Sequence, residues 1–175
     1  MSRAIDYSRT ARDLVRYSTN PVSFSPESNL VFYLGTRYGI KHQPKDLDEA
    51  IDVSRQDLES RIPLPDERRF KILAIHTVNL RERYRLDHSL TNLEEAINYD
   101  RELLEYTVTG SERAVWLSLL ANDLYQHFQH QRDLALLQEA IAIDREILQL
   151  LPVGHEQYEQ SLKNLLLDLN ESFTQ

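Results

Sequence analysis

The residue four positions after the isoleucine of a repeated Ala-Ile pair is always arginine, at Arg9, Arg55, Arg101 and Arg145. A guanidinium offers a planar fork of donors, so such a ladder could bind carboxylates or phosphates. Each arginine, however, lies at the edge of the apolar side of its segment. There its stem can cover the core while its head pairs with nearby acids such as Asp100 or Asp144. We therefore interpret the four arginines as structural.

The histidines and the paired acids offer little for metal or acid–base chemistry. His127 and His130 share one helix side, but a catalytic zinc needs three protein ligands, and the sequence has no HExxH arrangement. We interpret both as solvated or capping histidines. Adjacent acids such as Glu94 and Glu95 open helices, where they complement the helix dipole. Since phosphate-loop and nucleophile motifs are also absent, we predict no enzyme, no metal and no cofactor.

Basic residues concentrate in one segment, at Arg68, Arg69, Lys71, Arg81, Arg83 and Arg85. Acids interrupt this cluster, and the chain carries 20 Lys and Arg against 28 Asp and Glu, a net charge of −8. Nucleic-acid-binding proteins instead carry a continuous basic patch or stripe. We therefore predict no nucleic-acid partner.

Charge also changes along the chain. Residues 1–45 hold seven basic and three acidic residues, whereas residues 91–175 hold five basic and fifteen acidic ones. This gradient could attract copies head to tail or steer partners to different ends. A drift of composition on a solvated surface is the interpretation that we favour.

Composition limits the compartment and the class of protein. The 175 residues are 41% hydrophobic, which is enough for a folded core, and none is cysteine. A chain without thiols suits a reducing compartment. No apolar stretch approaches the roughly 18–20 residues that a membrane span needs. We expect a cytoplasmic protein without a membrane partner.

Prolines and glycines divide the chain into segments in which apolar residues recur at helical spacing. No segment alternates as a strand would. Asp46 with Glu49, and Thr91 with Glu94, have the spacing of a capping box, and Ser25 precedes a first-turn proline. The pattern predicts an all-α protein of about eight helices, near residues 2–17, 26–39, 46–61, 66–86, 90–106, 112–130, 134–150 and 155–173.

A repeat organises these helices. The string Ala-Ile-x3-Arg begins at residues 4, 50, 96 and 140, at intervals of 46, 46 and 44 residues. A second series places an aromatic residue four after a leucine, at Leu34, Leu80, Leu124 and Leu169. We call the helix with the leucine helix A and the helix with the alanine helix B. A hairpin of these two cannot bury both of its faces, so the repeat predicts an α-solenoid of stacked antiparallel hairpins.

The array resembles tetratricopeptide repeats. Leu34-Gly35-x2-Tyr38 matches the helix A pattern of that family, and Ala50 matches its small helix B residue. The period is longer than the roughly 34 residues of that family. The run from Leu151 to Phe173 resembles more closely the longer helical repeats of fungal multidomain proteins, which accompany caspase-like protease or nucleotide-binding signalling modules.

This resemblance implies a concave groove lined by helix A residues. They would be near Asn29, Phe32, Thr36, Ile75, Val78, Glu82, Arg85, Leu119, Asn122, Gln126 and Gln129. The mixed set lacks the Lys and Asn pattern that clamps a peptide carboxylate. It would suit an extended or helical peptide held by an apolar strip and side-chain amides.

We accordingly predict one helical-repeat domain over residues 1–175, with half repeats at 1–20 and 152–175 and repeats at about 21–62, 63–107 and 108–151. The predicted function is a non-enzymatic interaction scaffold that binds a protein or peptide through the groove or a terminal face. The alternative is a structural spacer or oligomerisation segment of a larger signalling or protease-associated protein. The last helix keeps an apolar stripe with no helix B after it, which suggests a fragment of a longer array or self-association through the terminal helices.

Overall fold

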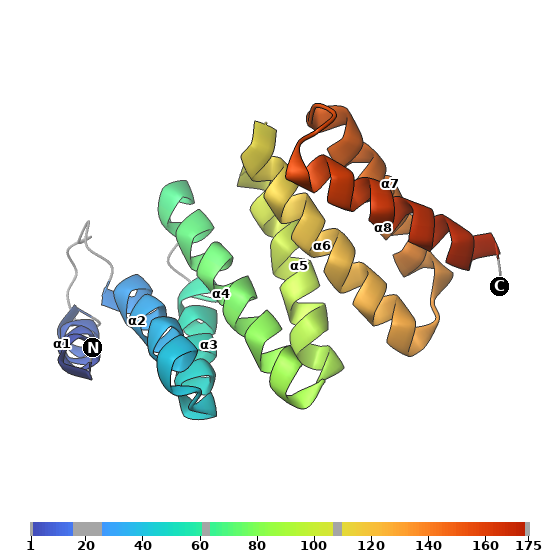
Figure 1. Cartoon of the computed structure of the whole chain (residues 1–175). Helices are drawn as coiled ribbons and strands as arrows, with labels where there is room; N and C mark the ends of the chain where they lie inside the picture. Colours follow the sequence, from blue (N-terminus) through green and yellow to red (C-terminus); the bar gives the residue numbers. More distant parts are fainter. Residues whose placement is uncertain (1, 16–25, 61–63, 107–109, 174–175) are drawn as a thin grey trace. The chain divides into compact units, whose positions relative to one another are not determined.

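A computed structural model describes residues 2–15, 26–60, 64–106 and 110–173. They form eight α-helices and no strand, which confirms the all-α prediction (Figure 1). The helices are α1 (Ser2–Val15), α2 (Pro26–Lys41), α3 (Pro44–Leu58), α4 (Asp66–Asp87), α5 (Leu90–Tyr106), α6 (Gly110–Gln131), α7 (Leu134–Leu150) and α8 (Glu156–Phe173). Residue 17, residue 61 and the predicted cap Ser25 lie outside the described residues.

The chain divides into two compact units, Met1–Asn92 and Leu93–Gln175. In the first unit, α1 packs on α2, α2 on α3 and α3 on α4, and α2 also packs on α4. In the second unit, α6 packs on α7, α7 on α8, and α6 also on α8. Packing on both the next helix and the next but one is the arrangement of an α-solenoid. The predicted grouping of all repeats into one domain stays a prediction.

The residues that define the repeat form the cores. The helix B alanines Ala50, Ala96 and Ala140 are fully buried, as are the helix A leucines Leu34, Leu80 and Leu124. The aromatic residues four positions after these leucines are buried as well. A small residue on helix B lets the helix axes approach, and the leucine and aromatic residue fill the space between them.

Three of the A helices end in the same way. His42, His88 and Arg132 each stand four residues after the repeat aromatic and adopt a left-handed backbone with φ of 51°, 52° and 57°. Each backbone N–H donates to the carbonyl oxygen of that aromatic residue, at N–O distances of 2.7 to 2.8 Å. This bond closes the last helical turn and fixes the direction in which helix B begins.

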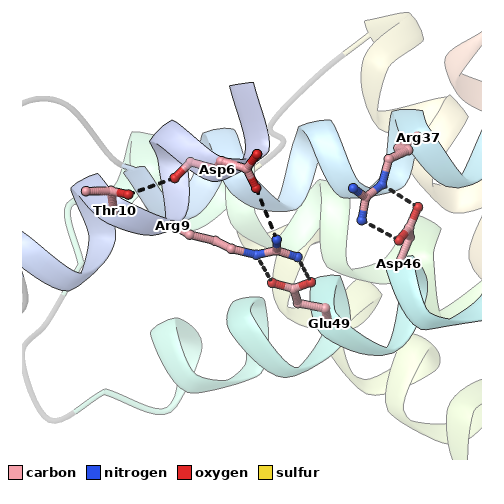
Figure 2. Close-up of polar contacts among 6 residues, drawn as sticks. All are labelled: Asp6, Arg9, Thr10, Arg37, Asp46 and Glu49. Atoms are coloured by element: carbon pink, nitrogen blue, oxygen red, sulfur yellow. Dashed lines mark hydrogen bonds and ion pairs between the residues drawn. The ribbon is translucent and has the colours of Figure 1, made fainter. Parts of the chain in front are cut away.

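The predicted capping role of Asp46 is wrong. α3 begins at Pro44, two residues before Asp46, and its N-cap residue Gln43 makes no side-chain capping bond. Asp46 is buried and accepts two hydrogen bonds from the Arg37 guanidinium, at 2.6 and 2.7 Å (Figure 2). The carboxylate therefore joins α2 to α3. Burying a charge without an opposite charge costs more free energy than leaving an exposed helix end uncapped, so the pairing with Arg37 is favoured.

Two repeat arginines connect one helix B to the next within a unit. Arg9 donates two hydrogen bonds to Glu49, as Figure 2 shows, and Arg101 donates two to Glu139. In both pairs the glutamate directly precedes the repeat alanine. Arg9 and Arg101 therefore have the predicted structural role, in which the head of the side chain pairs with an acid. The suggested partners Asp100 and Asp144 are instead buried in the cores.

Two further observations concern the described residues. His127 is buried and lies 3.1 Å from Glu94, so the interpretation of this histidine as solvated is wrong, whereas His130 is exposed.

None of the described helices is long and apolar enough to cross a membrane.

Candidate functional site

A groove lies between the two A helices of the first unit, α2 and α4, with a volume of about 720 Å3. We call it the apolar groove. Phe32 on α2 and Val78 on α4 expose 56% and 46% of their surface at its walls. Its lining residues are Phe32, Gly35, Thr36, Tyr38, Gly39, His42, Leu47, Ala74, Ile75, Val78, Asn79 and Glu82.

Two glycines make room for this groove. A Cβ atom at Gly35 would lie 2.9 Å from Oδ1 of Asn79, so a side chain there would have to displace the Asn79 side chain. A Cβ atom at Gly39 would meet no atom within 4 Å, because that position opens into free space. The glycines therefore set both the approach of the helices and the width of the space between them.

The floor of the groove belongs to the core. Leu30, Leu34 and Ala50 are buried in one cluster, and Ile75 packs against that cluster while also lining the groove. In the same core the Ser54 hydroxyl and Nδ1 of His76 are 2.6 Å apart. These contacts hold the walls in place, so the groove is formed before any partner binds.

Two polar side chains of the groove have partners within the fold, whereas a third, Asn79, has a buried nitrogen without one among the described residues. The Thr36 hydroxyl donates to the Phe32 carbonyl oxygen at 2.8 Å, and Glu82 pairs with Arg85. Asn79 exposes only 3% of its surface, and its Nδ2 is buried without a hydrogen-bond partner in the described part of the chain. The groove therefore combines apolar walls with one buried donor that has no acceptor.

The predicted groove residues of the first unit mostly come together. Five of them line the apolar groove: Phe32, Thr36, Ile75, Val78 and Glu82. Asn29 and Arg85 lie on the same two helices but outside the lining. The residues that the resemblance missed are chiefly Gly35, Gly39 and Asn79. The two glycines were visible in the sequence as glycines inside or at the end of a helical segment, but no sequence feature marked the amide.

A second cavity lies among α6, α7 and α8, with a volume of about 150 Å3. We call it the acidic cavity. Its lining residues are Ala121, Asn122, Tyr125, Asp144, Asn164, Leu167 and Asp168. Asn122 is the one predicted groove residue among them. Leu119, Gln126 and Gln129 lie on α6 outside this lining, so the structure does not bring the predicted residues of the second unit into one site.

The two cavities occupy the same surface of the repeat. Counted from the helix A leucines, five lining residues of one cavity stand at positions that line the other: Phe32 and Asn122, Gly35 and Tyr125, Ile75 and Asn164, Val78 and Leu167, Asn79 and Asp168. The position within the repeat therefore determines where each cavity lies, while the residue types at the lining positions differ. Tyr125 occupies space that glycine leaves open in the first unit.

Burial dominates the electrostatics of the acidic cavity. It raises the pKa of Asp144 to about 7, with a smaller contribution from neighbouring Asp168. The pKa of Asp168 rises to about 6, first through burial and then through Glu171. The Tyr125 hydroxyl donates to Glu171 at 2.9 Å, and burial raises the pKa of this tyrosine too. Two carboxyl groups thus stay partly protonated near neutral pH.

These groups do not form a metal centre. Among the residues that the structure describes, no three His, Cys, Asp or Glu side chains are grouped so that they could hold a metal ion.

No protein-family model matches this chain, and neither a curated protein nor a solved structure matches it.

Proposed function

We propose that this chain is a non-enzymatic interaction module that binds an extended peptide of a protein partner in the apolar groove. The observation that carries the proposal is the unpartnered Asn79 amide beside the exposed Phe32 and Val78. A buried donor left without an acceptor costs about 1–3 kcal/mol. A bound acceptor would recover that energy.

An extended peptide suits this groove better than a helical one. The backbone carbonyl groups of an extended segment have no partner within their own chain, whereas those inside a helix are already bonded. One such carbonyl could accept from Nδ2 of Asn79 while apolar side chains contact Phe32 and Val78. The groove volume of about 720 Å3 lies within the roughly 300–1,000 Å3 of typical binding sites.

Gly39 provides a test that leaves the fold intact. Its Cβ would meet nothing within 4 Å, so Gly39→Leu should fill the groove without a clash. Because glycine is a poor helix former, this change should also raise the melting temperature. Peptides selected from a random display library against the native chain should bind Gly39→Leu at least about tenfold more weakly, a loss of about 1.4 kcal/mol.

The matched control is Lys71→Leu, on an exposed position of α4 outside the groove. It adds the same side chain elsewhere and should leave peptide affinity unchanged. Equal binding to the native chain and to Gly39→Leu would contradict a groove site. So would a library that yields no peptide at all.

A second candidate function is assembly through α8. Leu166 and Leu167 on this helix expose 61% and 64% of their surface, which is unusual for adjacent leucines. Such a face would suit an oligomerisation or spacer segment. A mass by light scattering that rises with concentration, and falls to the monomer in Leu166→Gln, would favour this function. A constant monomer mass would exclude it.

Two further parts of the proposal concern kinship and location. The interval of 44 to 46 residues and the Leu34-Gly35-x2-Tyr38 string support a relation to tetratricopeptide-like arrays and to the longer repeats of fungal signalling proteins. A chain without cysteine supports a cytoplasmic location. Fractionation of source cells with an antibody against the chain would test the location.

A further inference from the structure

The acidic cavity has a buried floor and an exposed rim. Asp144 and Asp168 expose 1% and 4% of their surface, whereas Asn122 and Leu167 at the rim are exposed. The volume of about 150 Å3 is roughly ten times the 10–15 Å3 that one water molecule needs. The cavity therefore has room for a group of several heavy atoms beside the two buried aspartates.

Asp144 lacks the partner that its counterpart in the first unit has. It stands four residues after the repeat alanine of helix B, the position of Ser54. Ser54 contacts His76, which stands four residues before the leucine of the next helix A. In the second unit that position is Leu165, which packs against the apolar cluster around Phe128 and offers no donor.

The Asp144 carboxylate is buried at the cavity without a complete set of hydrogen-bond partners. The Ser161 hydroxyl lies close enough to lower its pKa, yet neither oxygen has a hydrogen-bond partner of ordinary geometry among the described residues. A buried carboxylate without donors is costly, and an entering cation with N–H groups would relieve this cost.

The second unit supplies no cation of its own to the cavity. Arg101, Arg113 and Arg132 are paired with glutamates, and Arg145 and Lys163 are exposed outside the lining. These five are all the basic residues of the segment 91–175, which holds fifteen acidic ones. The excess negative charge attracts cations toward this end of the chain.

The geometry favours a guanidinium over other cations. Both oxygens of the buried Asp144 carboxylate lack a hydrogen-bond partner among the described residues, and two parallel N–H groups of a guanidinium would match them. The chain makes this bidentate contact itself, between Arg37 and Asp46. Tyr125 adds an aromatic side chain to the lining, and a guanidinium is more weakly hydrated than an ammonium, so its burial costs less.

We propose that the acidic cavity is a binding site for a guanidinium group, held by Asp144 on the floor with Asp168 beside it. The guanidinium could come from an arginine side chain of a partner or from a free guanidino compound. This site is separate from the apolar groove and does not depend on the proposed peptide binding there.

The affinity should depend on pH because the carboxylates must be ionised. The titratable groups around Asp144 are Asp168 on α8 and Tyr125 on α6, with Glu171 next to Asp168. With pKa values of about 7 and about 6, both aspartates are charged at pH 8 and protonated at pH 5. The binding of a cation therefore strengthens as the pH rises, and a bound cation in turn lowers the pKa of Asp144.

The test titrates the full chain with three probes at constant ionic strength: methylguanidinium, propylammonium and the capped peptide Gly-Arg-Gly. Carboxyl and backbone NMR shifts report binding and the pKa of Asp144. Methylguanidinium should bind saturably at pH 8, about tenfold or more weaker at pH 5, and more tightly than propylammonium. If the tripeptide binds more tightly than methylguanidinium, the guanidinium comes from an arginine side chain of a partner. If methylguanidinium binds more tightly, the ligand is a free guanidino compound.

Two variants complete the design. Asp144→Asn keeps the shape of the side chain and should abolish saturable binding, whereas the exposed Glu105→Gln should leave it unchanged. Unchanged binding in Asp144→Asn, equal or tighter binding of propylammonium, or no saturable binding at pH 8 would overturn the proposal. The pKa of Asp144 in the native chain gives a second measurement, and a value that does not fall with saturating methylguanidinium would overturn it too.

Discussion

The apolar groove and the acidic cavity lie at equivalent positions of two different repeats, but the residues that line them differ in chemistry. Both lie between successive A helices, and their linings share five positions of the repeat. In the first unit these positions hold one glycine, three apolar side chains and Asn79, and the groove is wide. In the second unit they hold Tyr125, Leu167, Asp168 and two asparagines, and the cavity is small and polar. The repeat thus sets the place of a site, and a few substitutions set the class of ligand.

The same comparison extends to the buried polar residues. Ser54 and Asp144 occupy one position on helix B, but only Ser54 faces a histidine four residues before the leucine of the next helix A. A substitution of histidine by leucine at the facing position leaves Asp144 without that contact. Comparing equivalent positions of different repeats therefore identifies a polar group that lacks the partner of its counterpart.

The largest expected effect tests whether the two units are equivalent in packing. Leu34 and Leu124 are both fully buried at the same repeat position. Replacing either with alanine should lower the free energy of unfolding by about 2–5 kcal/mol, since it leaves a cavity. Urea denaturation measures both. A cost below this range at one of the two leucines would break the equivalence.

The next prediction concerns pH. The pKa of Asp144 is about 7 in the folded chain, against an ordinary value of 3.8. Between these values the folded state holds a proton that the unfolded state has lost, so this group makes stability fall as the pH rises from about 4 to about 7. Asp144→Asn removes that loss. It should stabilise the chain by about 1–3 kcal/mol at pH 8 and change little at pH 4.

Thermal unfolding at the two pH values checks this prediction, with the exposed Glu105→Gln as control. The same stabilisation at both pH values would mean that Asp144 ionisation is not its cause. A destabilised Asp144→Asn at pH 8 would mean that the carboxylate is satisfied in the fold, as Ser54 is.

A third prediction tests the satisfied member of the pair. Ser54→Ala removes the hydroxyl that contacts Nδ1 of His76, and should cost about 1–3 kcal/mol because both groups are buried. Ser118 is the control, since its hydroxyl donates to the carbonyl oxygen of Ala114 on its own helix. Urea denaturation that gives equal costs for both alanine variants would show that the contact with His76 adds nothing.

The smallest effect is expected at the connection between helices B. Arg101 and Glu139 are partly exposed, so water and salt screen their attraction. Arg101→Gln should therefore cost no more than about 1 kcal/mol. Denaturation at low and high salt measures it. A larger cost that is independent of salt would give the arginine a packing role.

The regular features of the fold could be predicted from the sequence. The fixed period located the buried leucines and alanines, because a position that repeats along a solenoid meets the same neighbours each time. The resemblance to tetratricopeptide repeats, rather than the period itself, implied five of the residues that line the apolar groove. Helix ends were predicted to within a few residues because prolines and glycines interrupt the apolar pattern.

The features specific to one repeat could not be predicted. Asp46 has the spacing of a cap, but only the distance to Arg37 on another helix shows its actual partner. His127 resembles an exposed residue until the burial of its helix face is known. The close approach at Gly35 and the unpartnered, buried amide nitrogen of Asn79 likewise depend on the distance between two helices, which no local sequence pattern determines.

The most direct test of two ligand chemistries on one repeat surface is a single NMR experiment. The labelled chain is titrated with a library-selected peptide and, separately, with methylguanidinium at pH 8. We predict that the peptide shifts the side-chain amide of Asn79 and the signals of Phe32 and Val78, while methylguanidinium shifts those of Tyr125, Asp144 and Asp168. Shifts of one shared set of residues by both probes, or a peptide that leaves the Asn79 amide unchanged, would contradict it.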